Sequence, residues 1–432
     1  MVPSAHIRQR HIARQKMFSS TLCWAFGNAF LTASVVYQMV RMMEISSGIG
    51  VSLIFLTPWL AGIFRWFTPV WIQLFQSKKR FILRAGILEI LFWYALLLFS
   101  LPHCFPPLLA YSGLLFFWLG ACLMEHCSFV ALLSWQGSLF PEKTRGRFFG
   151  ILEKWKLGGE IAGLATTLIF TWLWRNGFWG GMILKEYWIG FPMVISGTFF
   201  LWRRLLILQT IPEKETFSTP IFSLPRQWSR LKKPFQDQHF RPMLLYGALF
   251  SFITQLDQVA QVTLPYFLVG WGFLLTQGNR FFVKTGQFLL GGRCGKWLDR
   301  WAAPRVILFS QYATAVAPLF YVLALERGWG WLLAGQVFWI FYVGLNIGLP
   351  QIQLQMADSN DSSPWPAAYG FVCGIFGCLG MLSGGFLWDC FGKSTPQTYY
   401  ETIFTFSAYA RLLATLPLCW LFWKWKKSSR WP

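Results

Sequence analysis

The sequence is poor in charged residues, and acidic residues are especially few. Only 13% of its 432 residues are charged, with 17 Asp and Glu in total. A typical soluble domain has roughly 25% charged residues. A soluble protein of this size needs many more polar side chains to cover its surface. This shortage argues against a soluble enzyme, a disordered protein and a nucleic-acid-binding protein.

The sequence also lacks the residue clusters that bind metals. Its nine Cys are an odd number, and neither a Cys-x-x-Cys pair nor a Cys/His cluster has metal-ligand spacing. Most of the Cys lie inside apolar runs, where a Cys usually acts as a small apolar residue. We therefore expect no disulfide framework, no metal and no other cofactor.

Enzyme motifs are missing as well. The stretch from Gly392 to Ser394 has the Gly-Lys-Ser order of a P-loop, but Leu387 stands where that motif needs its upstream glycine. There is no Gly-x-Ser-x-Gly elbow and no His-Glu-x-x-His pair. We expect a protein that is not an enzyme and is not driven by ATP hydrolysis.

The chain is instead rich in apolar and aromatic residues. Hydrophobic residues make up 55% and aromatic residues 19%, and the mean hydropathy is +0.44. Such a composition predicts an all-α polytopic membrane protein that lies in the lipid bilayer. The basic N-terminus precedes an apolar run from Phe18 to Val40. This run is too long for a secretory signal and ends without a small-residue cleavage site, so we interpret it as an uncleaved span.

Apolar runs of about 20 residues, separated by charged or Pro/Gly breaks, predict twelve transmembrane helices. The predicted spans are 18–40, 48–75, 82–101, 106–135, 148–174, 182–202, 242–268, 272–292, 305–325, 329–351, 365–388 and 402–424. A long polar segment over 203–241 separates six spans from six. We therefore predict an N-terminal six-helix bundle over 1–202, a cytoplasmic linker over 203–241 and a C-terminal six-helix bundle over 242–432.

The basic residues are distributed very unevenly between the predicted loops. Of the 38 Lys and Arg, 29 lie on the side of both termini and five on the other side. Cytoplasmic loops carry an excess of Lys and Arg, so both termini are predicted to be cytoplasmic, and a bacterial inner membrane is expected. This topology accounts for the formal charge of +21 without nucleic acid. The linker, with Phe222, Trp228 and Phe235, either lies on the anionic inner leaflet or only connects the halves.

A loop after the eighth predicted span carries a recognisable motif. Gly295, Asp299, Arg300 and the later Arg305 match a pattern of Gly-x-x-x-Asp-Arg/Lys-x-Gly-x-Arg/Lys-Arg/Lys, with Ala302 in place of the second Gly. This stretch resembles the loop signature of the major facilitator superfamily. The corresponding loop after the second span keeps its basic end but has no acidic residue.

Two further loops strengthen this resemblance. The stretch from Pro141 to Gly150, which contains Arg145 and Arg147, looks like the loop that opens the fifth span in that superfamily. A counterpart over 357–370 opens a Gly-rich span in the second half. The resemblance implies two six-helix bundles around a central cavity that opens alternately to each side. It also implies that Asp299 and Arg300 act in a cytoplasmic latch rather than in solute binding.

Several ionisable residues lie inside predicted spans. A charge in hydrocarbon costs several kcal/mol, so such a residue is usually paired or faces a cavity. Polar groups of lower specificity, such as Asn346, are plausible cavity residues. The ionisable candidates are Arg65, Glu89, Glu125, His126, Glu160, Asp257, Arg280, Lys284 and Arg411.

The seventh predicted span has an unusual number of polar residues near its middle. Gln258 and Gln261 lie on one helical face, with Asp257 beside it and Gln255 close by. In the superfamily that this chain resembles, the equivalent helix lines the cavity. These residues therefore either line a solvated path or form a hydrogen-bonded cluster between helices.

The roles of the other charges stay open at this point. Arg280 and Lys284 are four residues apart and share a helical face, so they either pair with Asp257, attract an anionic solute, or lie at the outer interface. Glu125, Glu160 and Asp257 either titrate and couple transport to protons, or form permanent ion pairs with residues such as Arg65 or Arg411.

The leading hypothesis is a monomeric secondary transporter that moves a small solute by alternating access, with proton symport as one possible coupling. The Arg and Lys of the spans favour an anionic or zwitterionic solute. One alternative is a drug or lipophile exporter, although the fifth span lacks the Pro of the exporter pattern. The other is a transporter-like receptor or assembly protein, which the missing acid at Leu74 permits.

Overall fold

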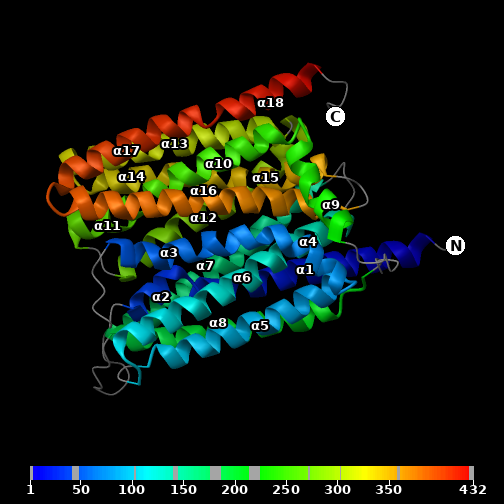
Figure 1. Cartoon of the computed structure of the whole chain (residues 1–432), viewed down its shortest axis with the longest axis horizontal. Helices are drawn as coiled ribbons and strands as arrows, with labels where there is room; N and C mark the ends of the chain where they lie inside the picture. The colour runs from blue at the N-terminus through cyan, green and yellow to red at the C-terminus, as the bar shows by residue number, and fades with distance from the viewer. Residues whose placement is uncertain are drawn as a thin grey trace.

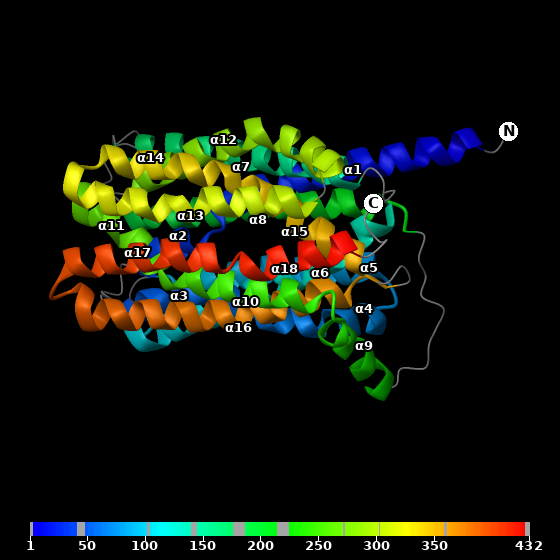
Figure 2. The same cartoon turned by 90° about the horizontal axis from the view of Figure 1, so that it is seen from above.

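A computed structural model of the chain describes residues 3–40, 48–101, 104–139, 145–175, 186–213, 224–270, 273–301, 303–357 and 361–427. These residues are almost entirely helical, and no strand occurs among them. Figure 1 shows two groups of roughly parallel helices, one from each half of the chain. Both termini lie at the same end of the molecule (Figures 1 and 2).

The first group contains the helices of the N-terminal half. Its members are α1 (Pro3–Phe30), α2 (Ala33–Val40), α3 (Gly48–Ile63), η2 (Phe64–Phe67), α4 (Thr68–Leu74), α5 (Lys78–Phe99), α6 (Pro107–Leu139), α7 (Arg145–Arg175), η4 (Glu186–Ile189) and α8 (Gly190–Gln209). Within this group α1 packs against α7 and α8, and α5 packs against α6 and α8.

The second group contains the helices of the C-terminal half. Its members are α10 (Arg241–Leu256), α11 (Gln258–Val269), α12 (Phe273–Trp301), α13 (Ala303–Arg327), α14 (Gly330–Trp339), η5 (Ile340–Tyr342), α15 (Val343–Met356), α16 (Pro364–Leu387), η6 (Trp388–Gly392), α17 (Pro396–Leu413) and α18 (Leu416–Lys427). Helix α9 (Leu224–Gln236) lies between the two groups in the sequence.

Nine helical segments of the described residues are long and apolar enough to cross a membrane. Each of the twelve predicted spans overlaps at least one helix, but the first, seventh and eighth are not among these nine. The seventh is broken at Asp257, and the eighth carries Arg280 and Lys284. The chain is therefore an integral multi-pass membrane protein, and the count of twelve stays a prediction.

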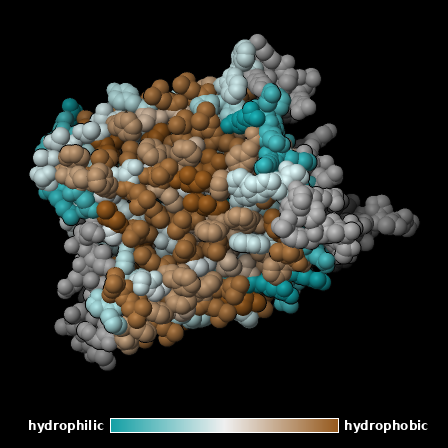
Figure 3. All heavy atoms as spheres, in the orientation of Figure 1, coloured by the Kyte–Doolittle hydropathy of each residue, from teal (hydrophilic) through white to brown (hydrophobic). Residues whose placement is uncertain are grey.

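The surface agrees with insertion in a bilayer. A broad hydrophobic band covers the middle of the visible face, and hydrophilic atoms gather at its two ends (Figure 3). Large side chains such as Leu98, Phe199 and Leu289 are more than half exposed on the helices. We call the end at which both termini lie the basic end. Its placement in the cytoplasm remains a prediction from the charge distribution.

The two groups touch through closely packed helix pairs. Helix α7 packs on α12, and α3 packs on α16. At the first contact, a Cβ added to Gly150 would lie 2.7 Å from the Cα of Gly295. At the second, a Cβ added to Gly374 would lie 2.6 Å from the backbone nitrogen of Ile63. Small residues allow this approach because no side chain separates the two backbones.

Two local breaks place charged side chains within the groups. The helical run from α3 to α4 tightens into η2, which carries Arg65, and Pro69 begins the following helix. Helix α10 ends at Leu256, and Asp257 separates it from α11. A polar group is tolerated at such a break when neighbouring helices satisfy it.

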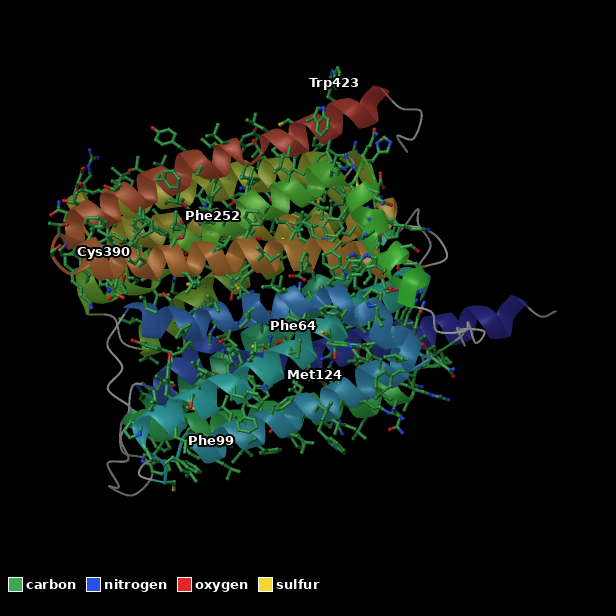
Figure 4. All side chains as sticks on the ribbon, in the orientation of Figure 1. Phe64, Phe99, Met124, Phe252, Cys390 and Trp423 are labelled. Carbon is green, nitrogen blue, oxygen red and sulfur yellow. The ribbon has the colours of Figure 1, made fainter. Side chains whose placement is uncertain are left out.

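The described Cys residues all carry free thiols. Most are buried or half-buried, whereas Cys104 and Cys390 are exposed. Cys104 follows α5 and precedes α6, and Cys390 lies in η6, so both are at the end opposite to the basic end. Figure 4 shows Cys390 at that far end.

Candidate functional site

A cavity of about 460 Å³, lined by both apolar and polar residues, lies between the two halves of the chain. Its walls come from α1, η2, α6, α7 and α8 on one side and from η5, α15 and α16 on the other. Its polar lining residues are Thr21, Asn28, Arg65, Glu125, His126, Gln136, Glu153, Lys156, Arg204, Asn346 and Gln353. Its aromatic lining residues are Trp24, Phe129, Phe149, Tyr342 and Tyr369. The predicted Arg65, Glu125 and Asn346 are thus brought together here.

Arg65 enters the cavity from the η2 turn. A guanidinium nitrogen of Arg65 contacts Nδ1 of His126 on α6, and its carbon lies 5.6 Å from the ring centre of Phe129. The Nε atom of Arg65 is buried and has no hydrogen-bond partner. Figure 4 shows the neighbouring Phe64 near the boundary between the two groups of helices. Arg65 is therefore a cation with unused hydrogen-bonding capacity beside the cavity.

A second cation, Arg204, reaches the cavity from α8. Its side chain is only 6% exposed, and its guanidinium carbon lies 5.8 Å from the ring centre of Trp24. The carboxylate of Glu125 accepts a hydrogen bond of 3.3 Å from Asn28 and interacts electrostatically with Arg204 and Arg65. The N-terminal wall thus presents two cations around one carboxylate.

A polar contact crosses the cavity from one half to the other. On α7, Lys156 forms an ion pair of 3.0 Å with Glu153. The amide of Asn346 on α15 donates a hydrogen bond of 3.3 Å to the same Glu153 carboxylate. This link joins the two halves through side chains that line the cavity.

Glu160, Arg280 and Lys284 form a separate polar cluster between α7 and α12. The ammonium of Lys284 lies 2.7 Å from the Glu160 carboxylate, and Arg280 donates a hydrogen bond of 3.1 Å to Gln277. Of the three alternatives for Arg280 and Lys284, pairing with Asp257 is not found among the described residues, since Asp257 pairs with Arg411. The reason is geometric: the shared face of α12 points towards α7 of the other half.

Asp257 instead forms a fully buried ion pair with Arg411. Both side chains are 0% exposed, and Arg411 donates a hydrogen bond of 2.8 Å to the carboxylate. Ser407 donates to the same oxygen at 2.5 Å, and Gln261 donates to the other oxygen at 2.8 Å. This is the hydrogen-bonded cluster that the sequence left as the alternative to a solvated path.

The polar residues of the seventh span do not line the 460 Å³ cavity. Its lining contains none of Gln255, Asp257, Gln258, Gln261 and Arg411. Gln255 is buried among the helices, and the Arg411 guanidinium lies 4.9 Å from the ring centre of Trp339. Asp257, at the break between α10 and α11, is buried in the interior of the C-terminal half together with Gln255 and Arg411.

The loop motif of the second half makes a contact between the halves. The Asp299 carboxylate accepts a hydrogen bond of 2.8 Å from the backbone N–H of Arg147 at the start of α7. Desolvation raises the pKa of the Asp299 carboxyl above its usual range, and the N–H groups of Arg147 and Gly146 oppose that rise. Arg300 and Arg305 lie on the exposed surface, and the side chain of Arg145 lies outside the described residues.

The corresponding loop of the first half contacts an acidic residue from another part of the chain. Leu74, at the position of the missing Asp, is 58% exposed. Glu213, which follows α8, accepts hydrogen bonds from the hydroxyl of Ser77 and from the N–H of Lys79, the latter at 3.2 Å. Sequence reasoning missed Glu213 because it is distant in sequence from the loop it contacts.

Sequence reasoning also missed three charged groups that lie in or beside the cavity. Glu153 and Lys156 lie near the start of the predicted span 148–174 and were not considered as site residues, although their spacing of three residues could have indicated a pair on one helical face. Arg204 was counted with the linker because it lies near the end of a predicted span. Its burial depends on the packing of α8 against α1 and α5, which no local pattern reveals.

Comparisons with known proteins show the fold. No protein-family model and no curated protein matches the chain. Solved structures match nearly its whole length: a bacterial homologue of the iron transporter ferroportin in an outward-facing state has a TM-score of 0.67 and 12% identity, covering 95% of this chain and 99% of that one. The proton:xylose symporter of the major facilitator superfamily gives 0.67 and 12%, covering 96% of each chain.

A human organic anion transporter is also similar, with a TM-score of 0.64 and 11% identity over 95% of this chain and 99% of that one. All three are described as transporters, a symporter or a homologue of a transporter, and the fold that this chain shares with them is helical in the described residues. The chain has the fold of the major facilitator superfamily.

Proposed function

We propose that this protein is a secondary transporter that moves a small anionic or zwitterionic solute by alternating access. The observation that carries the proposal is the cavity of about 460 Å³ between the two halves, with Arg65 and Arg204 in its wall. A fold of this kind places a solute site where its halves meet. The transport proteins with a similar fold support the proposal.

The charges of the cavity wall favour a solute that carries a carboxylate or a similar anion. Lys156 is neutralised by Glu153, whereas Arg65 and Arg204 have a single further carboxylate in the cavity lining, that of Glu125. The wall therefore has an excess of positive charge. A planar guanidinium binds carboxylates through paired hydrogen bonds, and these are strong when water is excluded. An ammonium group of a zwitterion would find Glu125 and the aromatic faces of Trp24 and Phe129.

The contacts between the halves supply the elements of a gate. At the basic end, Asp299 binds the N–H of Arg147, and Ser134 lies 3.0 Å from Ser362. At the opposite end, the N–H of Ile49 donates a hydrogen bond of 2.9 Å to Asp389. Alternating access would break one set of contacts while the other forms. We propose proton symport for the coupling, a single chain as the working unit, and a bacterial inner membrane as the location.

The proposal is tested by solute uptake into liposomes. The purified protein is reconstituted and offered pools of labelled dicarboxylates, amino acids, sugar phosphates and neutral sugars in turn. We expect saturable uptake of an anionic or zwitterionic pool. Replacing Arg65 by Gln removes hydrogen bonds to a charged group, which are worth about 1.5–3 kcal/mol, so uptake should fall about tenfold to a hundredfold.

A matched variant distinguishes the loss of a positive charge in the cavity from the loss of a positive charge on the surface. Arg293 lies on the exposed surface of α12, and Arg293→Gln should leave uptake unchanged. Uptake of neutral sugars alone would overturn the proposed solute class. Failure of the wild-type protein to accumulate any pool would favour a protein that no longer transports.

A further inference from the structure

Glu89 is a buried carboxyl group that lies outside the cavity lining. It lies on the inward face of α5, where Ala85, Gly86 and Trp93 are also buried at helical spacing. Its side chain is 3% exposed and does not line the cavity. The ring of Trp93 packs on Trp118 of α6 at 5.1 Å between centres. Glu89 is thus enclosed by helices on both sides of α5.

The charged and titratable groups around Glu89 come from two helices. Helix α6 presents Glu125 and the thiol of Cys122, and α8 presents Arg204. Helix α4, which also touches α5, contains no titratable residue. Arg204 is therefore the one cation that acts on Glu89 among the described residues, and it acts on Glu125 as well.

The neighbours of Glu125 and Glu89 do not stabilise the two ionised carboxylates equally. Glu125 accepts a hydrogen bond from Asn28 and feels the charges of Arg204, Arg65 and Lys156. By contrast, Oε2 of Glu89 is buried and has no hydrogen-bond partner. A buried carboxylate is costly unless it is paired and hydrogen-bonded, and a nearby like charge adds to the cost. The charge of Arg204 supports Glu125, and Glu89 is left as the group that takes a proton.

We propose that Glu89 is the proton-binding site of this protein and that the proton is linked to solute binding through Arg204. Arg204 reaches both the cavity and Glu89. An anion that pairs with Arg204 takes away the only cation that favours ionised Glu89, so Glu89 then holds its proton more tightly. Linkage is reciprocal, and protonated Glu89 in turn leaves Arg204 free for the anion.

The direction of coupling follows from this linkage. Anion and proton bind cooperatively, so Glu89 holds its proton more tightly in the loaded protein and releases it more readily once the anion has left. The two therefore cross the membrane in the same direction, which is symport. No covalent step is involved: the proton enters from the water on one side and leaves to the water on the other. This coupling depends on the proposed transport function, whereas proton binding at Glu89 does not.

The proton on Glu89 can be detected without a known solute. Infrared spectra of the purified protein are recorded in H₂O and D₂O, with the pH raised in steps. We expect a protonated-carboxyl C=O band at neutral pH that disappears at alkaline pH. The band should be absent in Glu89→Gln, which has the shape of the protonated side chain and should fold normally. Glu153→Gln, which changes a carboxylate paired with Lys156, should leave the band unchanged.

Two more variants test the link to Arg204 and do not depend on the folding of Glu89→Gln. In Arg204→Gln the cation is lost, so the band should persist to a proton concentration about tenfold lower or more. In Glu125→Gln the cation is freed to pair with Glu89, so the band should disappear at a lower pH than in the wild type. Absence of the band in the wild type, or its persistence in Glu89→Gln, would overturn the proton site. An unchanged band in Arg204→Gln would overturn the link.

These results are distinguishable from failure of the transport proposal. Saturable solute uptake by a protein without the band would indicate a transporter that lacks this proton site. The band in a protein that takes up no solute would indicate a proton site in a chain that does not transport. With both present, Glu89→Gln should move solute without moving protons.

Discussion

Residue scale: the ion pair of Asp257 and Arg411 shows how a charge becomes acceptable inside the protein. Both side chains are fully buried, and Ser407 and Gln261 donate hydrogen bonds to the carboxylate. The backbone carbonyl of Arg411 also accepts a hydrogen bond from Gln311. The Asp257 carboxylate thus accepts three hydrogen bonds, which makes the pair a structural element of the C-terminal half.

Loss of one member of this pair should therefore destabilise the protein. Asp257→Asn leaves Arg411 as an uncompensated buried charge, which typically costs about 3–5 kcal/mol of unfolding free energy. Denaturant unfolding in detergent, followed by circular dichroism, measures this loss. The double variant with Arg411→Gln removes both charges and should recover much of the stability. If Asp257→Asn were as stable as the wild type, the pair would not have the structural role assigned to it.

The sequence could identify these charged residues but could not pair them. Helical spacing correctly placed Arg280 and Lys284 on one face of a helix. The direction of that face depends on how α12 is rotated against α7, and this rotation is decided by packing between distant segments. For the same reason Arg65 and Glu125 were recognised as candidates, while Arg204 and Glu153, nearer to predicted loops, were not.

Element scale: the crossing of α7 and α12 is a close contact between the halves near the basic end. The two helices pass so closely at Gly150 and Gly295 that a Cβ on either residue would lie within 3.0 Å of backbone atoms of the other helix. Backbone cannot move aside as the end of a flexible side chain can. The separation of these two helices is therefore set by the absence of side chains.

A methyl group at this crossing should push the two halves apart. Gly150→Ala is expected to cost about 1–3 kcal/mol through overpacking. It should also speed amide hydrogen exchange at the first turns of α7. Gly292→Ala, on the partner helix α12, is the control, because a Cβ there meets no atom within 4 Å. Equal behaviour of the two variants would mean that the crossing adapts freely and does not set the separation.

Most helical elements could be predicted from apolar runs, but their internal breaks could not. Each predicted span overlaps a helical segment, because a run of apolar residues is a strong local signal. The η2 turn at Arg65 and the interruption at Asp257 are stabilised by contacts with α6 and with α17. These contacts are distant in sequence, so a single helical pattern does not contain them.

Whole-molecule scale: helix α9 ties the two halves together at the basic end. Trp66 of η2 packs against Phe235 of α9 at 4.9 Å and against Phe371 of α16 at 4.1 Å between ring centres. Arg230 of α9 also forms an ion pair with Asp361, which precedes α16. Figure 2 shows α9 at the end of the molecule where the termini lie. The linker therefore packs against both halves and does not only connect them.

Removal of the shared ring should loosen this helix. Aromatic pairs contribute about 0.5–1.5 kcal/mol each beyond the area they bury, so Trp66→Ala should speed amide hydrogen exchange of α9 about two- to tenfold. Exchange with mass spectrometry in lipid nanodiscs measures it for residues 224–236. Phe64→Ala changes a neighbouring ring of the same η2 turn that is 38% exposed, and should leave α9 unaffected. Unchanged exchange in Trp66→Ala would show that α9 is held by other contacts.

The two exposed thiols allow the orientation of the protein in the membrane to be measured. Cys104 and Cys390 lie at the end opposite to the basic end, while the other seven Cys are buried or half-buried. A maleimide that cannot cross lipid should therefore label intact cells from outside if the basic end is cytoplasmic, and only inverted vesicles if it is not. The side of the membrane from which the maleimide labels the native protein thus gives its orientation, and no tag or engineered residue is needed.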